Sequence, residues 1–477
     1  MEAPPSGSLG RRRFLLCGFL LGSLELLHAG PMFGAIFISA QPRFACRHSS
    51  LPPPSSDDDF DQQCGASSAN MTIDATGAVD CFAENATIHF DASFGDTIVS
   101  EWELVCDWSH WAGHSTSLYM AGVTMGALLM PYAADRWGRR PCLLLCCWME
   151  SIVGLLSAFA PAFALFLLFR VVVGLFSMGA ALCMWVLVLE SLGPSSRAWM
   201  VLPGGASWCT GIALTGALAY WLANWRSLLG VYSLGLLILS VIFTWIAPES
   251  LHWLCATGQQ EKAQTWLQKT ARQYRVEVDA LTALFHLRDG STPTAKRSAS
   301  ILDLWKSRPL AIVTAVLLLQ WFVNSAVWAG LAEYGPRLSS ERHVDFILGT
   351  LTDLPGYLLI YPQLNKFGRR NTLTLWVFSA ELFPTAVRAG GLGLGVVASR
   401  AAAYFFLHVD WMVGWLALSS AASLLLAALS LAASPLALLL PETHLKTLSP
   451  AVETADFGGD NSPLTSCPVG RNYETID

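Results

Sequence analysis

The chain has 477 residues, of which 53% are hydrophobic and only 13% are charged, and its formal net charge is −6. Soluble domains carry about 25% charged residues, so this chain has too few charges to coat a large water-facing surface. A helix of about 20 apolar residues spans a bilayer and satisfies its own backbone hydrogen bonds there. Apolar runs of roughly that length or longer lie at 14–40, 112–134, 142–163, 165–190, 200–222, 227–247, 309–331, 344–364, 389–408 and 411–440. The sequence therefore predicts an all-α, multi-pass membrane protein with about ten spanning helices.

The first apolar run follows Arg11, Arg12 and Arg13, as the core of a signal peptide would. It is longer than such a core and no A-x-A cleavage site follows it, so we interpret it as a retained first helix. Cytoplasmic loops carry an excess of Lys and Arg, and here the excess falls in the loops that share a side with the N-terminus. Both termini are therefore expected in the cytoplasm, and the plasma membrane is the expected location.

Residues 41–110 form a long acidic segment that we expect outside the cell. It contains two Asn-x-Thr acceptor sites, Asn70 and Asn85, and four cysteines, which are Cys46, Cys64, Cys81 and Cys106. Disulfides persist in the oxidising compartment, and N-glycosylation marks surface loops of secreted segments. We expect both modifications here. Four cysteines allow three pairings, which the sequence leaves open.

Three short signals at the ends of apolar runs occur twice along the chain. W-G-R-R at 137–140 corresponds to F-G-R-R at 367–370, and P-E-S at 248–250 corresponds to P-E-T at 441–443. Between them, Glu190 precedes Arg197 by seven residues, as Glu381 precedes Arg388. The repetition predicts a protein built from two similar halves.

The spacing of these signals indicates that the second half is short. Glu190 and Glu249 lie 59 residues apart, and Glu381 and Glu442 lie 61 apart. In contrast, 50 residues separate Arg140 from Glu190, but only 11 separate Arg370 from Glu381. The difference of 39 residues is close to two membrane spans. We therefore expect six helices in the first half and four in the second, with 371–380 too short to cross.

Residues 126–140, G-A-L-L-M-P-Y-A-A-D-R-W-G-R-R, resemble the loop motif of the major facilitator superfamily. An Asp near a helix end, a Gly turn and an Arg pair suit a charge lock between helices. Pro131 departs from the motif, which usually has a second Gly there. E-W-E-L-V-C-D at 101–107, W-F-V-N-S at 321–325 and E-L-F-P-T at 381–385 are similar to signatures of solute carrier family 22, whose members transport organic cations, anions and zwitterions.

The resemblance covers nearly the whole chain apart from the gap, and it implies the major facilitator fold without its ninth and tenth helices. It implies a six-helix bundle over 1–247, a cytoplasmic loop at 248–308, a truncated bundle over 309–446 and a cytoplasmic tail at 447–477. The implied function is secondary transport of organic ions by alternating access of two bundles. The alternative is a transporter-like receptor or scaffold, suggested by the missing pair, by Pro131, and by His252 in place of the usual Arg.

Ionisable groups inside membrane helices cost about 2.5–3.5 kcal/mol on insertion scales, so each marks a candidate site. Arg400 lies at the position resembling the family's eleventh helix, where anion carriers tend to have Arg, and it favours an organic anion. A helix-packing Arg is the alternative. Aromatic residues at such sites either stack on a substrate or anchor the helix at the interface. The other candidate substrate contacts are Glu25, Trp321, Phe322, Asn324 and Trp328.

We expect a set of charged residues to gate the pathway or to lock the helix ends on the cytoplasmic side. This set comprises Asp135, Arg136, Arg139, Arg140, Arg170, Glu190, Arg197, Arg369, Arg370, Glu381 and Arg388. The sequence has no phosphate-binding loop, no zinc-spaced Cys/His cluster and no nucleophile elbow, so we expect no catalytic residue, cofactor or metal. The expected partners are the bilayer and a small organic ion, with no nucleic acid; the sequence does not indicate an oligomeric state.

The outer position of 41–110 can be tested with an N-glycosidase. Treatment should increase the gel mobility of the mature protein, because it removes glycans from Asn70 and Asn85. The variant that combines Asn70→Gln with Asn85→Gln should show no further shift. An unchanged mobility of the wild-type protein would contradict the expected topology.

Overall fold

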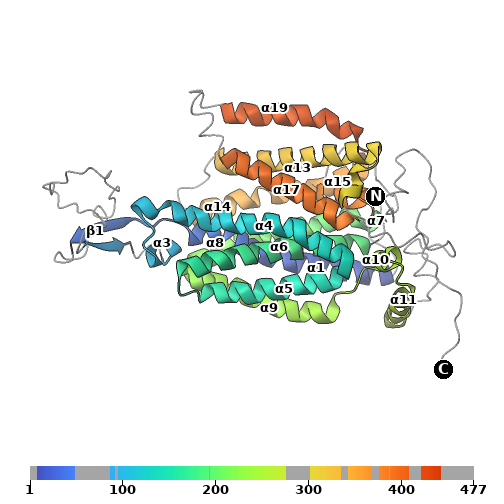
Figure 1. The fold of residues 1–477 in the computed structure, drawn as a ribbon, viewed down its shortest axis with the longest axis horizontal. Helices are drawn as coiled ribbons and strands as arrows, with labels where there is room; N and C mark the ends of the chain where they lie inside the picture. The colour runs from blue at the N-terminus through green and yellow to red at the C-terminus, as the bar shows by residue number, and fades with distance from the viewer. Residues whose placement is uncertain are drawn as a thin grey trace.

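The computed structural model describes residues 8–48, 86–91, 95–192, 194–274, 301–334, 342–367, 375–385, 387–407 and 421–441. Most of these residues are helical, and the long helices run side by side along the longest axis (Figure 1). The residues that form the core are apolar and are drawn from every long helix of the first half. The expected all-α architecture is confirmed.

Seven helical segments of the described chain are long and apolar enough to cross a membrane. They coincide with the first seven apolar runs of the sequence. In chain order they are α1 (Ser8–Phe33) with its extension α2 (Ala35–Ile38), α4 (His110–Trp137), α5 (Arg139–Ala158), α6 (Phe163–Glu190), α8 (Val201–Leu222), α9 (Trp225–Ile246) and α13 (Arg308–Tyr334).

The last three apolar runs contain helices that are not among these seven. The run at 344–364 is divided by Thr352 and Asp353 into α14 (Arg342–Leu351) and α15 (Leu354–Phe367). The later runs contain α17 (Arg388–Leu407) and α19 (Ala421–Leu436), which is followed by the 3-10 turn η7 (Ala437–Leu439). Between α15 and α17 lies α16 (Leu375–Leu382), whose eight residues extend over about 12 Å and cannot cross a bilayer.

The short elements gather at the two ends of the bundle. At one end (Figure 1) lie the antiparallel strands β1 (Phe44–His48) and β2 (Ala86–Phe90), together with α3 (Ile98–Glu101) and η3 (Cys106–Trp108). At the opposite end lie α10 (Leu251–Ala256) and α11 (Gln260–Tyr274). The remaining short elements are α7 (Pro194–Arg197), η4 (Ala198–Met200) and η5 (Ile301–Trp305). The described parts of the segments 41–110 and 248–308 thus occupy opposite ends, although which end is cytoplasmic stays a prediction.

Glycines allow α4 and α6 to pack with their backbones in contact. A Cβ atom on Gly122 would lie 2.0 Å from the carbonyl oxygen of Val171, and one on Gly126 would lie 2.2 Å from that of Leu175. Gly174 makes the reciprocal approach to α4. Small residues at such positions are typical of membrane helices, which associate by close packing because lipid supplies no hydrophobic drive.

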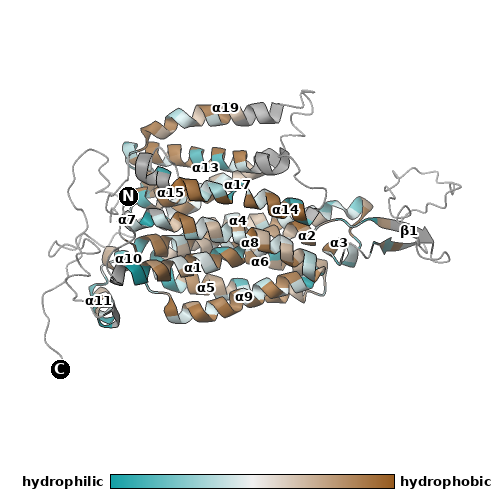
Figure 2. Ribbon diagram, turned by 180° about the vertical axis from the view of Figure 1, so that it is seen from behind, coloured by the Kyte–Doolittle hydropathy of each residue, from teal (hydrophilic) through white to brown (hydrophobic). Residues whose placement is uncertain are grey.

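The two halves of the chain meet along α4 and α17. A Cβ atom on Gly393 would lie 2.1 Å from the carbonyl oxygen of Ala127 and 3.0 Å from the Pro131 ring. Helix α4 continues through Pro131, which is buried at this interface. The proline that replaces the motif glycine therefore contacts a glycine on the opposite half. Helix α13 packs on α17, and α19 lies on the outer side of α13 (Figures 1 and 2).

Large apolar side chains remain exposed on the outward faces of the long helices, where Figure 2 shows many hydrophobic residues. Trp221, Trp245 and Leu431 are among the most exposed, at 84%, 83% and 76%. Exposure of such apolar surfaces to water is unfavourable, whereas their contact with lipid tails is not. The exposure therefore agrees with a protein embedded in a bilayer.

The segment E-W-E-L-V-C-D connects the strand-bearing end to the bundle. Glu101 forms a salt bridge with Arg226 at the start of α9 and accepts a hydrogen bond from Trp225 Nε1 at 2.8 Å. Arg226 also donates to the carbonyl oxygens of Ala158 and Ala160, at 2.7 and 2.8 Å. The same signature includes Cys106, which is disulfide-bonded. Asn70, Asn85, Cys64, Cys81 and the side chain of Cys46 lie outside the described residues.

Replacing Gly126 should separate α4 from α6. Gly126→Val should destabilise the protein by about 1–3 kcal/mol or more, because the added carbons would meet backbone atoms that cannot move aside. Thermal unfolding in detergent measures this loss. Gly113→Val, in the same helix, is the matched control because a Cβ atom there meets nothing within 4 Å. Equal loss in both variants would show that helix propensity, and not packing, sets the effect.

Candidate functional site

A buried cluster of charges lies where α5 begins and α6 ends. Arg139 donates from Nε to Glu190 Oε2 at 3.3 Å and forms a salt bridge with Asp135 at 2.9 Å. It also donates to the carbonyl oxygen of Ala134 at 3.0 Å. Arg139 and Glu190 are both fully buried, so each charge depends on these partners.

The second half of the chain contributes to the same cluster. Arg388, at the first position of α17, donates from Nη1 to Glu190 Oε1. Arg139 Nη2 donates to the carbonyl oxygen of Thr385 at 2.9 Å. Ser250, which begins α10, also donates to Glu190. A single carboxylate therefore joins both halves of the protein, and we call Arg139, Glu190 and Arg388 the charge lock.

Glu249 caps the first turn of α5 beside the charge lock. Its Oε1 accepts from the backbone N–H groups of Arg139 and Arg140 at 3.1 and 3.2 Å, and a carboxylate is favourable at a helix N-terminus. Burial raises the pKa of Glu249, while these N–H groups oppose the shift. The turn is made by Gly138 with φ of +113°, where a Cβ atom would lie 2.8 Å from Glu249 Oε2.

The other expected gating residues lie in several different environments. Arg140 donates to the carbonyl oxygen of Thr244 at 2.8 Å, and Arg136 is exposed. Arg197 donates to the carbonyl oxygens of Leu189 and Leu192, near the end of α6. Glu381 is buried in the last turn of α16. Arg369 and Arg370 lie outside the described residues.

His252 lies beside the charge lock at the position where the family usually has Arg. It is buried near Arg197, Glu190 and Arg388. Burial and the nearby guanidiniums lower its pKa to about 4, so the imidazole is neutral at pH 7. A neutral side chain suits this position, because Arg197 and Arg388 already place positive charge beside it.

Polar side chains from three helices form a second buried cluster in the first half. His28 Nε2 of α1 lies 2.9 Å from Glu150 Oε2 of α5, and both side chains are almost fully buried. One helical turn earlier, Glu25 Oε1 accepts from Trp185 Nε1 of α6 at 2.7 Å. The sequence predicts Glu25 as a candidate substrate contact, but it gives no signal for the bond from Trp185.

Arginines from α6 and α17 approach Tyr119 of α4. The Arg170 guanidinium lies 4.4 Å from the centre of the Tyr119 ring and donates to the carbonyl oxygen of Pro31 at 2.9 Å. Arg400 Nη1 lies 3.8 Å from the sulfur of Met120. Within the described chain, Arg400 has no salt bridge, and its Nε has no hydrogen-bond partner.

The expected aromatic contacts are spread along α13. Trp321 is buried and donates from Nε1 to Ser379 Oγ of α16 at 3.1 Å. Phe322 is half-buried and Asn324 is exposed. Trp328 is 45% exposed and makes an edge contact with Phe33 of α1, with ring centres 6.1 Å apart.

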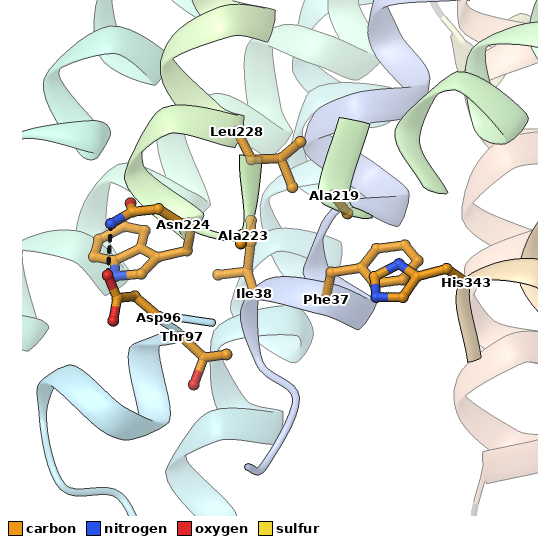
Figure 3. A pocket seen from close by; sticks show the side chains of 10 residues that line it. Phe37, Ile38, Asp96, Thr97, Ala219, Ala223, Asn224, Leu228 and His343 are labelled. Carbon is orange, nitrogen blue, oxygen red and sulfur yellow. Dashed lines mark hydrogen bonds between the residues drawn. The ribbon is translucent and has the colours of Figure 1, made fainter. Parts of the chain in front are cut away.

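A small pocket lies at the end of the bundle that carries the strands (Figure 3). Asn224 donates to Asp96 at 2.9 Å on one side of it. On the other side, the Phe37 ring stacks on His343 of α14 with ring centres 4.8 Å apart. This pair joins α2 in the first half to α14 in the second. No group of three His, Cys, Asp or Glu side chains suited to a metal occurs in the described parts of the chain.

Comparison with known proteins places these features in context. Residues 60–352 match the family described as "Sugar (and other) transporter". An organic cation transporter protein of Drosophila melanogaster is 29% identical over 431 residues, covering 80% of this chain and 78% of the relative. Solute carrier family 22 member 1 of Bos taurus is 29% identical over 407 residues, covering 76% and 71%.

The proton:xylose symporter XylE of the major facilitator superfamily, solved with 6-bromo-6-deoxy-D-glucose, superposes with a TM-score of 0.62. The alignment covers 93% of this chain and 99% of XylE at 16% identity, which shows a shared fold.

The charge lock predicts energetic coupling between the two halves. Glu190→Gln and Arg388→Gln should each destabilise the protein by about 3–5 kcal/mol, because each leaves an uncompensated buried charge. The double variant should lose less than the sum, with a coupling of about 1–3 kcal/mol. Thermal unfolding of the four proteins in detergent measures it.

The exposed pair Arg43 and Asp91 provides a matched control, since its N–O distance is 3.1 Å but Arg43 is 47% exposed. Its coupling should stay below about 1 kcal/mol. Additive losses at Glu190 and Arg388 would show that the two residues do not act as a unit.

Proposed function

Because the chain belongs to the Sugar (and other) transporter family and has the fold of the major facilitator superfamily, we propose that it is a secondary transporter of small organic ions, which moves organic anions in preference to cations by alternating access. Its relatives include organic cation transporters and members of solute carrier family 22, which supports organic ions as the substrate class. The proposal places the substrate site between the two bundles, where carriers of this architecture bind their substrates.

Arg400 is the observation that carries the anion preference. It lies about 18 Å along α17 from the charge-lock end of the helix, which is near the middle of a bilayer core. The described residues supply no carboxylate partner, so its charge is available to a ligand. A guanidinium in a medium of low dielectric attracts an anion strongly and pairs with a carboxylate through two parallel hydrogen bonds.

The charge lock supports alternating access. It closes one end of the bundle through contacts between α5, α6 and α17. At the other end, Phe33 and Phe37 of the first half contact Trp328 and Phe346 of the second. Ionic contacts at one end and aromatic contacts at the other can break and re-form separately as the bundles rock.

The alternative function, a receptor or scaffold that does not transport, is favoured by α16. This helix replaces two spans with eight residues, so the second bundle lacks surfaces on which its helices would otherwise pack. The uptake of organic ions distinguishes the two functions. Surface-displayed protein that takes up no member of a broad panel of organic anions and cations would favour the receptor.

Substituting Arg400 tests the preferred charge of the substrate. Arg400→Ala should reduce organic-anion uptake at least roughly tenfold at unchanged surface level, because a charged hydrogen bond contributes about 1.5–3 kcal/mol. Arg400→Lys should retain part of the uptake through its charge, without bidentate geometry. Arg43→Ala, at the exposed end of the strands, should leave uptake unchanged. Strong cation uptake that survives Arg400→Ala would overturn the assignment.

A further inference from the structure

Helix α16 enters the bundle from the charge-lock end. Thr385, three residues beyond its last residue, contacts Arg139 in the charge lock. Trp376 lies at the opposite end of the helix. It precedes Leu382 by six residues, which corresponds to about 9 Å along the helix axis. Leu375 and Val377 to Leu382 are all buried, so this segment is packed inside the protein although it cannot cross the bilayer.

The Trp376 ring lies between tryptophans from the two halves. It stacks on Trp185 of α6 with ring centres 5.6 Å apart and ring planes 22° apart. Its other contact is edge-to-face with Trp321 of α13, with centres 5.2 Å apart and planes at 79°. Stacked and edge-to-face contacts at these distances are the favourable geometries for aromatic pairs. The first and second halves therefore meet here through one indole of α16.

The two flanking tryptophans are held by their own hydrogen bonds. Trp185 Nε1 donates to Glu25, and Trp321 Nε1 donates to Ser379. A Cβ atom on Gly395 would lie 2.7 Å from Trp321 Nε1, so the Trp321 ring lies directly on the α17 backbone. Gly395 precedes Arg400 by five residues, about 7.5 Å along the helix. The space between the Trp185 and Trp321 rings, which we call the aromatic slot, is thus ordered, and it packs on the same helix that carries Arg400.

We propose that Trp185 and Trp321 line a binding site for a flat aromatic ring, and that Trp376 of this chain occupies it. The inference rests on the proposed function and narrows its substrate class to organic anions that carry an aromatic ring. A ligand must displace Trp376 before its own ring can enter. The apparent affinity of the ligand is therefore its affinity for the empty slot multiplied by the fraction of molecules in which the slot is empty.

The test removes the internal ring and supplies a free one. Trp376→Ala in the full-length, detergent-purified protein should unfold at a temperature several degrees below the wild type, and added indole should recover part of that difference. Indole should leave the wild type unchanged, because its slot is full. Trp245→Ala, which truncates a tryptophan of α9 that is 83% exposed, is the matched control and should not respond to indole.

Failure of indole to stabilise Trp376→Ala would overturn the ring site. Trp376→Leu serves if the alanine variant is not recovered folded, since it keeps apolar volume but removes the indole; absence of an indole response there would have the same meaning. Indole-3-acetate should stabilise Trp376→Ala more than tryptamine does. Equal stabilisation by both would support the ring site and contradict the proposed anion preference, so the two failures are distinguishable.

Discussion

The structure depends on the burial of one carboxylate, that of Glu190. A fully buried charge is tolerated only when partners replace the water it has lost, and Glu190 receives Arg139, Arg388 and Ser250. These partners come from α5, α17 and the start of α10, so one group fixes the relative positions of three elements. The two halves of the chain share few other polar contacts of this kind in the described residues. Moving them apart at this end requires that Glu190 or its arginines regain water or new partners.

Much of this arrangement could be predicted from the sequence, because hydropathy and repeated motifs are local signals. The apolar runs locate the helices, and the duplicated R-R, Glu and Arg signals locate the helix ends on which the lock is built. The partner of Glu190 could not be predicted in the same way. Arg197 follows Glu190 by seven residues, whereas Arg388, which forms the salt bridge with Glu190, lies 198 residues away in the sequence. Trp185 and Trp376 were missed for a related reason, since an aromatic inside a continuous apolar run has no signal that separates it from core packing.

The missing pair of spans has a structural consequence that the sequence indicates only as a gap in spacing. From Leu375 on, the residues between Arg370 and Glu381 form the first part of a short, buried helix, α16. Trp376 and Ser379 on that helix contact Trp321, and Trp376 also contacts Trp185. The shortened segment therefore provides packing in the centre of the protein, where a ligand would otherwise supply the contacts.

This relation constrains how the protein can work. Opening the charge-lock end breaks the bonds of Glu190, and admitting a ring requires that Trp376 leave its two neighbours. Helix α16 and the lock residue Arg388 belong to one short stretch of chain, because α16 leads through Thr385, which contacts Arg139, to Arg388. Movement of α16 is therefore expected to strain the lock, and release of the lock to free α16. A ligand can shift this equilibrium only by as much as it binds the open state more tightly than the closed one. A substrate that offers both a ring for the slot and a negative charge for Arg400 has two such contacts, and it is the kind of ligand best able to open the protein.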